Sequence, residues 1–203
     1  MPSLQRLCSP LVISLAAAGL LGGCQSLDPR LSDRTVYLGG HKDPQEVRDN
    51  ADNYSYWAGD SVQGAPSVRI RLGEQRAYFY KNGELVGLSS ISSGREGFGT
   101  PTGSFKIKEK DKNHQSSLYG DYVNAKGEVL QKDIDRKKDP MPSGARFDGA
   151  KMPYFMRIVG AVGMHQGFLP GVPDSHGCIR MPKEMAEAFF RNVELGTPVV
   201  IEP

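Results

Sequence analysis

Two apolar runs joined by Asn82-Gly83 constrain the fold of this chain more tightly than any other feature of the sequence. The runs occupy residues 77–80 and 85–88. Both central residues of a two-residue hairpin turn must accept a positive φ, and Asn followed by Gly does so at little cost. The pattern therefore predicts an antiparallel β-hairpin, and it argues for a domain that is largely β.

The rest of the C-terminal two thirds fits this fold class. Val68 and Ile70 alternate with arginines, which is the period of a half-buried strand. Further strand candidates are the apolar runs at 105–107, 155–159 and 199–201. One helix is predicted with Pro182 at its first position, because Met185, Ala188 and Phe189 recur at helical spacing. We therefore expect a mainly β fold, a β-rich α+β domain with one or two helices.

The chain divides into segments of different composition. We expect the folded domain to span residues 67–203, preceded by a polar tether over residues 24–66. Residues 36–38 and 54–57 are rich in aromatic side chains, so either of them could pack on the domain as an N-terminal extension. Residues 108–152 are polar and show little periodicity, and so long an irregular segment is more often a functional flap than a plain connection. The sequence predicts a lid there.

Residues 1–23 have the proportions of a signal peptide, since Arg6 precedes an apolar run that is too short to span a bilayer as a mature helix. The run closes on small residues and Cys24, which resembles a bacterial lipobox. That resemblance implies that Cys24 becomes the lipidated first residue of an exported lipoprotein. Gln25 favours the outer membrane, facing the periplasm, in a cell with two membranes. The alternatives are an ordinary secretory signal with an incidental cysteine or an uncleaved apolar anchor.

Cysteine usage and charge exclude several classes of protein. Of the three cysteines, Cys8 is lost with the signal peptide and Cys24 is acylated, so Cys178 is left as the one free thiol and a disulfide-stabilised fold is excluded. A net charge of +2 and a pI of about 8.4 are too balanced to suggest a nucleic acid as partner.

Cys178 lies in the heptapeptide Ser-His-Gly-Cys-Ile-Arg-Met with two histidines close in sequence, which is typical of an activated nucleophile. An ordinary thiol is mostly protonated at neutral pH and needs a base. His165 lies thirteen residues earlier, and the turn-rich segment between them would let a strand, a reverse loop and a return strand bring it beside Cys178. We assign His165 as the general base and His176 as a structural or substrate-orienting partner.

The residues around the cysteine receive supporting roles. Gly177 lets the backbone approach a substrate closely, and the N–H groups of Gly177 and Cys178 could form an oxyanion hole. Ser175 is expected to support the motif. Arg180 could bind a carboxylate or hold the backbone of the motif, although it could also simply face solvent beside the start of the helix.

This heptapeptide with its upstream histidine resembles the active-site signature of the YkuD-type L,D-transpeptidases. Residues 91–94 and 100–105 also resemble a family segment, "STG…TPxGxF". The resemblance covers about residues 67–203. The family usually has Gly directly after the histidine, whereas this chain has Gln166 before Gly167.

The resemblance implies an enzyme that acts on peptidoglycan stem peptides and needs no cofactor. Cys178 would attack the amide after the third residue of a tetrapeptide stem and release D-alanine. The thioester would pass to an amine of a neighbouring stem and form a three-to-three cross-link. The implied fold is a sandwich of mixed sheets with the catalytic loop at one end, the lid beside the cleft and Tyr154 near the substrate.

Four alternatives stay open. Water as acceptor would make the protein an L,D-carboxypeptidase or amidase, and a protein lysine would make it an anchoring enzyme. His165, His176 and Cys178 have the residue types of a zinc site with an open position, but neither a fourth ligand nor a general-base glutamate lies nearby in the chain. The protein could also be a wall-binding lipoprotein without activity.

Overall fold

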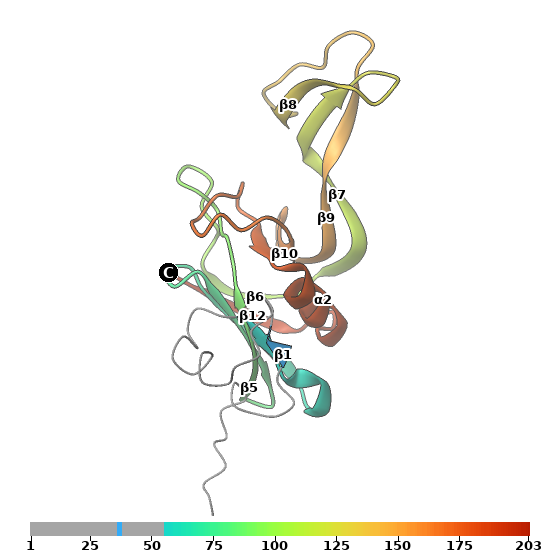
Figure 1. The fold of residues 1–203 in the computed structure, drawn as a ribbon. Helices are drawn as coiled ribbons and strands as arrows, with labels where there is room; N and C mark the ends of the chain where they lie inside the picture. Colours follow the sequence, from blue (N-terminus) through green and yellow to red (C-terminus); the bar gives the residue numbers. More distant parts are fainter. Residues whose placement is uncertain (1–35, 38–54) are drawn as a thin grey trace, which may run out of the picture.

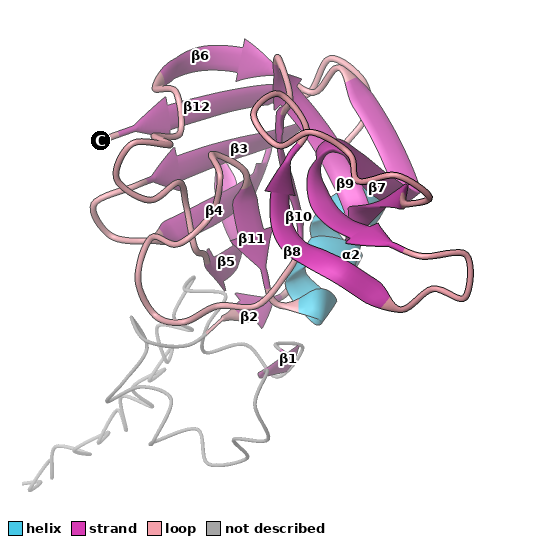
Figure 2. Ribbon diagram, turned by 90° about the horizontal axis from the view of Figure 1, so that it is seen from above, coloured by secondary structure: helices cyan, strands magenta, loops and turns pink. Residues whose placement is uncertain are grey.

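The computed structural model describes residues 36–37 and 55–203, and the predicted signal peptide and Cys24 lie outside these residues. The described residues form two mixed β-sheets and one α-helix, α2 (Lys183–Asn192). The larger sheet has seven strands in the order β1 (Val36–Tyr37), β2 (Tyr56–Trp57), β5 (Glu84–Ser90), β4 (Arg76–Lys81), β3 (Pro66–Arg71), β12 (Pro198–Glu202) and β6 (Gly103–Lys106). The smaller has five, in the order β11 (Ile179–Met181), β10 (Val162–Gln166), β9 (Arg146–Val159), β7 (Glu109–Val123) and β8 (Val129–Asp135). Figure 2 shows the two sheets side by side.

The predicted hairpin is confirmed as β4 and β5. Lys81 pairs with Glu84, so Asn82 and Gly83 form a two-residue turn, and their φ angles are 51° and 81°. These positive values are those that the turn requires and that an Asn-Gly pair adopts readily.

The predicted fold class is also confirmed. Both sheets are mixed, because β12 runs parallel to β3 in one and β10 runs parallel to β11 in the other. The alternation predicted for the first strand is present, with Val68 and Ile70 buried and Arg69 exposed between them. The predicted helix is confirmed as α2, which begins at Lys183, one residue after the predicted first residue Pro182, and buries Met185, Ala188 and Phe189.

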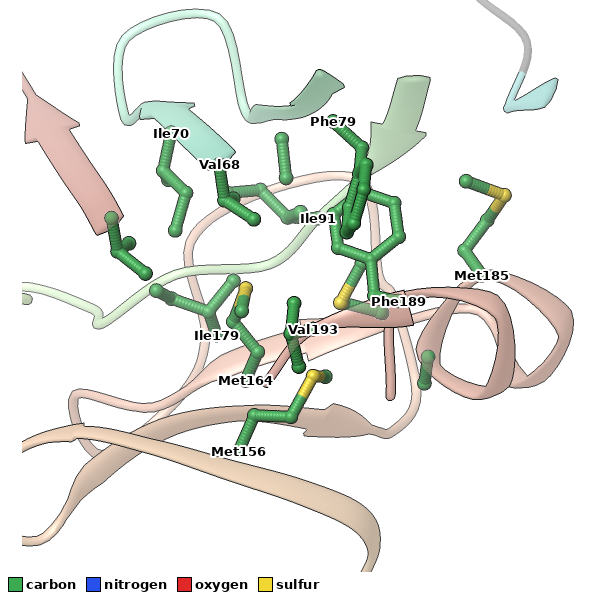
Figure 3. Packing of buried hydrophobic residues seen from close by; sticks show 14 of the residues in the cluster. Val68, Ile70, Phe79, Ile91, Met156, Met164, Ile179, Met185, Phe189 and Val193 are labelled. Carbon is green, nitrogen blue, oxygen red and sulfur yellow. The ribbon is translucent and has the colours of Figure 1, made fainter. Parts of the chain in front are cut away.

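The hydrophobic core lies between the two sheets and is closed by α2 (Figure 3). Phe79 from the larger sheet meets Phe189 of α2 edge to face, with ring centroids 4.9 Å apart. Met156 and Met164 enter the same cluster from the smaller sheet. Without a disulfide in the described part of the chain, this packing holds the two sheets together.

The N-terminal boundary differs from the prediction. Tyr56 and Trp57 pair with Leu88 and Gly87 of β5, so β2 extends the larger sheet and the folded domain begins near residue 55 rather than 67. The Trp57 ring packs 5.1 Å from Phe79 and belongs to the core. Both aromatic segments within the predicted tether supply strands of this sheet, since β1 pairs with β2 and β2 pairs with β5.

The prediction that residues 108–152 are irregular is wrong. They form β7, β8 and the first part of β9, a three-stranded extension that projects from the body of the molecule (Figure 1). The pairing of β7 with β9 shifts register between Gln115 and Gly120. Gly149 lies opposite this shift, where a Cβ atom would come 2.0 Å from the Ser116 carbonyl oxygen, so only glycine allows the two backbones to approach this closely.

Over the residues that the structure describes, no helix has the length and apolar character needed to cross a membrane.

Candidate active site

The loop that carries Cys178 is held by a second loop, residues 91–100. Ser92 bridges to Arg180 in antiparallel fashion and Gly94 bridges to Ser175 in parallel fashion. Thr100 Oγ1 donates a hydrogen bond to the Gly177 carbonyl oxygen (2.9 Å) and accepts one from the Gly94 N–H (3.0 Å). The two segments that resemble family motifs are therefore in direct contact, and one of them fixes the backbone of the other.

A turn closed by Ser175 shapes the approach to the thiol. Ser175 is buried, and its hydroxyl donates to the Cys178 carbonyl oxygen while accepting from the Gly177 N–H at 3.0 Å. Gly177 has a φ of 104°, which favours glycine at this position. The predicted oxyanion hole needs correction, because the Gly177 N–H is already bonded to Ser175. Of the predicted pair, the Cys178 N–H is the donor that is left.

Parallel pairing, rather than a reverse hairpin, brings the predicted base to the cysteine. Met164 of β10 lies opposite Ile179 of β11, and His165 lies opposite Arg180. His165 and Cys178 consequently line the same cavity, which has a volume of about 540 Å³. Its walls come from the catalytic loop, from β10 and from the extension, so the extension does lie beside the cleft.

The His165 ring is oriented by its own backbone. Its Nδ1 lies 2.7 Å from the Gln166 carbonyl oxygen. A carbonyl oxygen can only accept, so Nδ1 carries the proton and Nε2 keeps a free lone pair. The ring is 6% exposed, and burial lowers its pKa from 6.5 to about 4. His165 is therefore neutral at physiological pH and able to accept a proton at Nε2.

Cys178 rests as a thiol. Burial is the largest influence and raises its pKa, whereas a backbone hydrogen bond from Gly163 and the charges of Arg157 and Arg180 act in the opposite direction. The Sγ atom contacts the Ala161 carbonyl oxygen at 3.6 Å. The Cys178 thiol and the His165 imidazole line one cavity and are both uncharged at rest, so the thiol must lose its proton when it attacks.

His176 is enclosed by aromatic rings. It stacks on Tyr119 of the extension at 4.4 Å and meets Phe98 edge to face at 4.7 Å. Its Nε2 lies 2.8 Å from Arg95 Nη2, and because a guanidinium only donates, Nε2 accepts. Burial and the charge of Arg95 both lower the pKa of His176. These contacts fit a structural or orienting role better than that of a mobile base.

Arg180 is held within its own loop. Its guanidinium pairs with Asp174 at 2.9 Å, and its backbone exchanges hydrogen bonds with Ser92. These contacts support the expectation that Arg180 holds the backbone of the motif. The Arg180 side chain also lines the cavity.

Tyr154 does not lie near the reacting groups, contrary to the expectation from the family resemblance. Its ring packs against Phe190 of α2 at 5.8 Å and is not among the residues that line the cavity. The next residue, Phe155, is buried and faces His165, with ring centroids 6.3 Å apart. The backbone at Tyr154 has a φ of 59°, outside the extended range, and the ring lies against α2 rather than in the cleft.

The zinc hypothesis lacks the geometry that it needs. In the described part of the chain the residues whose ligand atoms converge closely enough to hold a metal are Glu109, Asp111 and His114, and the trio of His165, His176 and Cys178 does not converge. Glu109 is already paired with Arg157.

Sequence reasoning missed several residues of the site. Thr100 belonged to a segment matched as a motif, but nothing local showed that its hydroxyl would hold Gly177. Arg95 and Phe98 follow the first matched segment, and Tyr119 lies in the polar stretch; none carried a signal that tied it to His176. Their contacts join residues far apart in sequence.

Comparison with known proteins identifies the family and the fold. Residues 65–201 match the YkuD family, described as the L,D-transpeptidase catalytic domain. Solved L,D-transpeptidases share the fold. An Enterococcus faecium mutant enzyme is 24% identical with a TM-score of 0.51, covering 68% of this chain and 50% of its own. A Mycobacterium smegmatis enzyme is 15% identical with a TM-score of 0.52, covering 74% and 66%. One from Xylanimonas cellulosilytica is 20% identical with a TM-score of 0.50, covering 78% and 68%.

This chain thus spans about half to two thirds of the length of these structures. No curated protein matches it.

Proposed function

Because this chain belongs to the YkuD family of L,D-transpeptidase catalytic domains, we propose that it is a peptidoglycan L,D-transpeptidase with Cys178 as its nucleophile. The observation that carries the proposal is the meeting of the Cys178 thiol and a neutral, oriented His165 in one cavity. Thiol and base within one site are the minimum that cysteine acyl transfer requires.

The first half-reaction would form a thioester. A tetrapeptide stem would place the amide between its third residue and the terminal D-alanine against Sγ. As Sγ attacks the carbonyl carbon, the thiol proton would move to His165 Nε2, and the Cys178 N–H would stabilise the oxyanion. Collapse of the intermediate breaks the C–N bond, and His165 returns the proton to the departing D-alanine amine.

The second half-reaction would resolve the thioester. An amine of a neighbouring stem attacks the carbonyl carbon, His165 takes the amine proton and then protonates the departing thiolate, and a three-to-three cross-link results. Water as acceptor would give a trimmed tripeptide instead, which is the carboxypeptidase alternative. A protein lysine as acceptor would give a protein anchored to the wall.

The test uses purified tetrapeptide-containing wall and soluble stem peptides. We expect the native chain to release D-alanine and to gain the mass of the acyl group, and Cys178→Ala to do neither while unfolding at the same temperature. Mass spectrometry of the muropeptides identifies the acceptor. A Cys178→Ala chain that still produced cross-linked or trimmed stems would remove Cys178 from the mechanism. A native chain that bound wall without reacting would leave the non-catalytic alternative.

We also propose that Cys24 is lipidated and tethers the domain to a membrane, as the lipobox-like sequence at residues 21–24 suggests. In a cell with two membranes the anchor would be the outer membrane. Metabolic labelling with a radioactive fatty acid should label the native protein and not a Cys24→Ala variant, with fractionation of the two membranes giving the location. Equal labelling of both proteins would contradict this proposal.

A further inference from the structure

The charge of the residues that line the cavity is uneven. Among the residues that the structure describes, the cavity is lined by four cationic residues and by no Asp or Glu; the four are Lys137, Lys151, Arg157 and Arg180. His165 and His176 add no charge near neutral pH, because the pKa of each is lowered. A cleft lined by charges of one sign concentrates the field within it and attracts ligands of the opposite sign.

The arginines are already compensated, whereas the lysines are not. Arg157 pairs with Glu109, and Arg180 pairs with Asp174. Neither lysine ammonium has an ion pair, a side-chain hydrogen bond or an aromatic contact with any described residue. The unmatched positive charge of the cavity therefore comes from Lys137 and Lys151.

Both lysines belong to the extension, and contacts with β7 fix the position of the backbone that carries each of them. Lys151 lies on β9, opposite Gln115 of β7. Lys137 lies in the loop after β8, which is held to β7 by hydrogen bonds from Arg136 to the carbonyl oxygens of Leu118 (3.0 Å) and Ser117 (3.2 Å). The extension thus contributes two lysines to the lining of the cavity that also contains Cys178.

We propose that Lys137 and Lys151 are specificity residues that bind free carboxylates of the donor stem beside the scissile amide. This inference rests on the proposed function. A stem whose third residue is a diamino dicarboxylic acid has one carboxylate on the second residue and one on the third, besides that of the terminal D-alanine. Amidation of either group removes its charge, and a third residue with a single carboxyl group lacks the second of them. The site therefore selects unamidated, dicarboxylic stems.

The experiment compares four tetrapeptide donors that differ in amidation alone: free, amidated at the second residue, amidated at the third, and amidated at both. D-Alanine release by the native full chain in detergent gives kcat/KM for each donor. Exposed charge pairs contribute little individually, so we expect loss of both carboxylates to lower kcat/KM by roughly tenfold. The two singly amidated donors show how much each carboxylate contributes.

The variant Lys137→Gln/Lys151→Gln should lose a similar factor on the free donor and almost nothing on the doubly amidated donor. The matched control is Lys132→Gln, an exposed lysine of β8 that does not line the cavity and should behave as the native chain does. Added salt should weaken the preference for the free donor in the native chain and leave the double variant unaffected.

Binding of the four donors to a Cys178→Ala chain separates the two proposals. D-Alanine release without a preference among the donors, or an equal loss on all donors in the double variant, would overturn carboxylate selection and leave the transpeptidase assignment standing. Preferential binding of the free donor by Cys178→Ala, together with no D-alanine release by the native chain, would support the recognition and overturn the reaction. Binding of none of the donors would overturn both.

Discussion

At the scale of single residues, the central feature of the site is that its thiol and imidazole are both neutral at rest. Burial raises the pKa of Cys178 and lowers that of His165. Burial thus disfavours the charged form of each residue, and with it a preformed thiolate–imidazolium pair. The nucleophile is generated only as a substrate is attacked. A resting thiol of this kind reacts slowly with adventitious electrophiles.

His165 should therefore matter far more to acylation than His176. We expect His165→Ala to slow D-alanine release by about 10² to 10⁴-fold, the usual contribution of a positioned proton acceptor. His176→Ala should cost less, because its ring nitrogen is already occupied by Arg95. In the native chain, alkylation of Cys178 should rise with pH up to values above the pKa of an ordinary cysteine. A larger loss of D-alanine release in His176→Ala than in His165→Ala would exchange the two roles. Alkylation whose rate reaches a plateau at acidic pH would show that Cys178 and His165 form an ion pair.

The buried His165 should also make the fold sensitive to acid. Its pKa is about 4 in the folded chain and 6.5 when unperturbed, so the unfolded chain takes up the proton first as the pH falls. Stability is therefore lost between pH 6.5 and 4, by about 2 kcal/mol at pH 5. In His165→Gln this part of the loss should vanish, as measured by urea denaturation at pH 7.5 and 5. Identical pH dependence in the two proteins would contradict the depressed pKa.

At the scale of elements, the extension of β7, β8 and β9 joins the catalytic loop through one aromatic contact. Four residues of β7, Ser116 to Tyr119, bulge out of the pairing with β9, and Tyr119 stacks on His176. Ser116 Oγ supports the bulge by accepting from the N–H groups of Leu118 and Tyr119. The extension is thus a folded ribbon with a defined contact to the site, and its movement as a lid stays a prediction.

Breaking that contact should favour water over the amine acceptor. A closed lid excludes water from the thioester, and an aromatic pair contributes about 0.5–1.5 kcal/mol. We expect Tyr119→Ala to raise the ratio of hydrolysed to cross-linked product about threefold while slowing the first acylation less. Tyr80→Ala, on the outer face of the larger sheet, is the control. Unchanged product ratios, or hydrogen exchange in β7 and β8 as slow as in the core strands, would argue against a lid.

At the scale of the whole molecule, the larger sheet depends on a strand that lies before the matched domain. β2 adds to the edge of β5, and Trp57 fills space in the core against Phe79 and Phe189. Gly87 accommodates the indole, because a Cβ atom there would come 2.6 Å from it. The family match begins at residue 65, so the folded unit is longer than the matched segment.

A chain that starts at residue 67 should accordingly be less stable than one that starts at residue 55. Removing a buried Trp side chain costs about 3–5 kcal/mol, and Trp57→Ala in the full chain should lose a similar amount. Chemical denaturation of the two truncated chains and of Trp57→Ala measures the differences. Equal midpoints for the two truncated chains would show that β2 packs on the domain without stabilising it.

The sequence by itself determined the features that rest on local rules. Asn82-Gly83 specified its turn through backbone φ, and Met185, Ala188 and Phe189 specified the buried face of α2 through their spacing. The alternation at β3 was readable because one face of that strand is buried. The cysteine loop was recognisable because its motif is contiguous, and the family match confirms that recognition.

Only the tertiary structure decided the rest. β7 and β8 escaped prediction because much of the extension faces solvent on both sides, so no face requires apolar residues and no alternation is left in the sequence. Four features depend on how segments meet in space: the parallel pairing of β10 with β11, the hydrogen bond of the Gly177 N–H to Ser175, the stacking of Tyr119 on His176 and the packing of Tyr154 on α2. Such contacts depend on packing between distant segments, which local propensity and spacing do not encode.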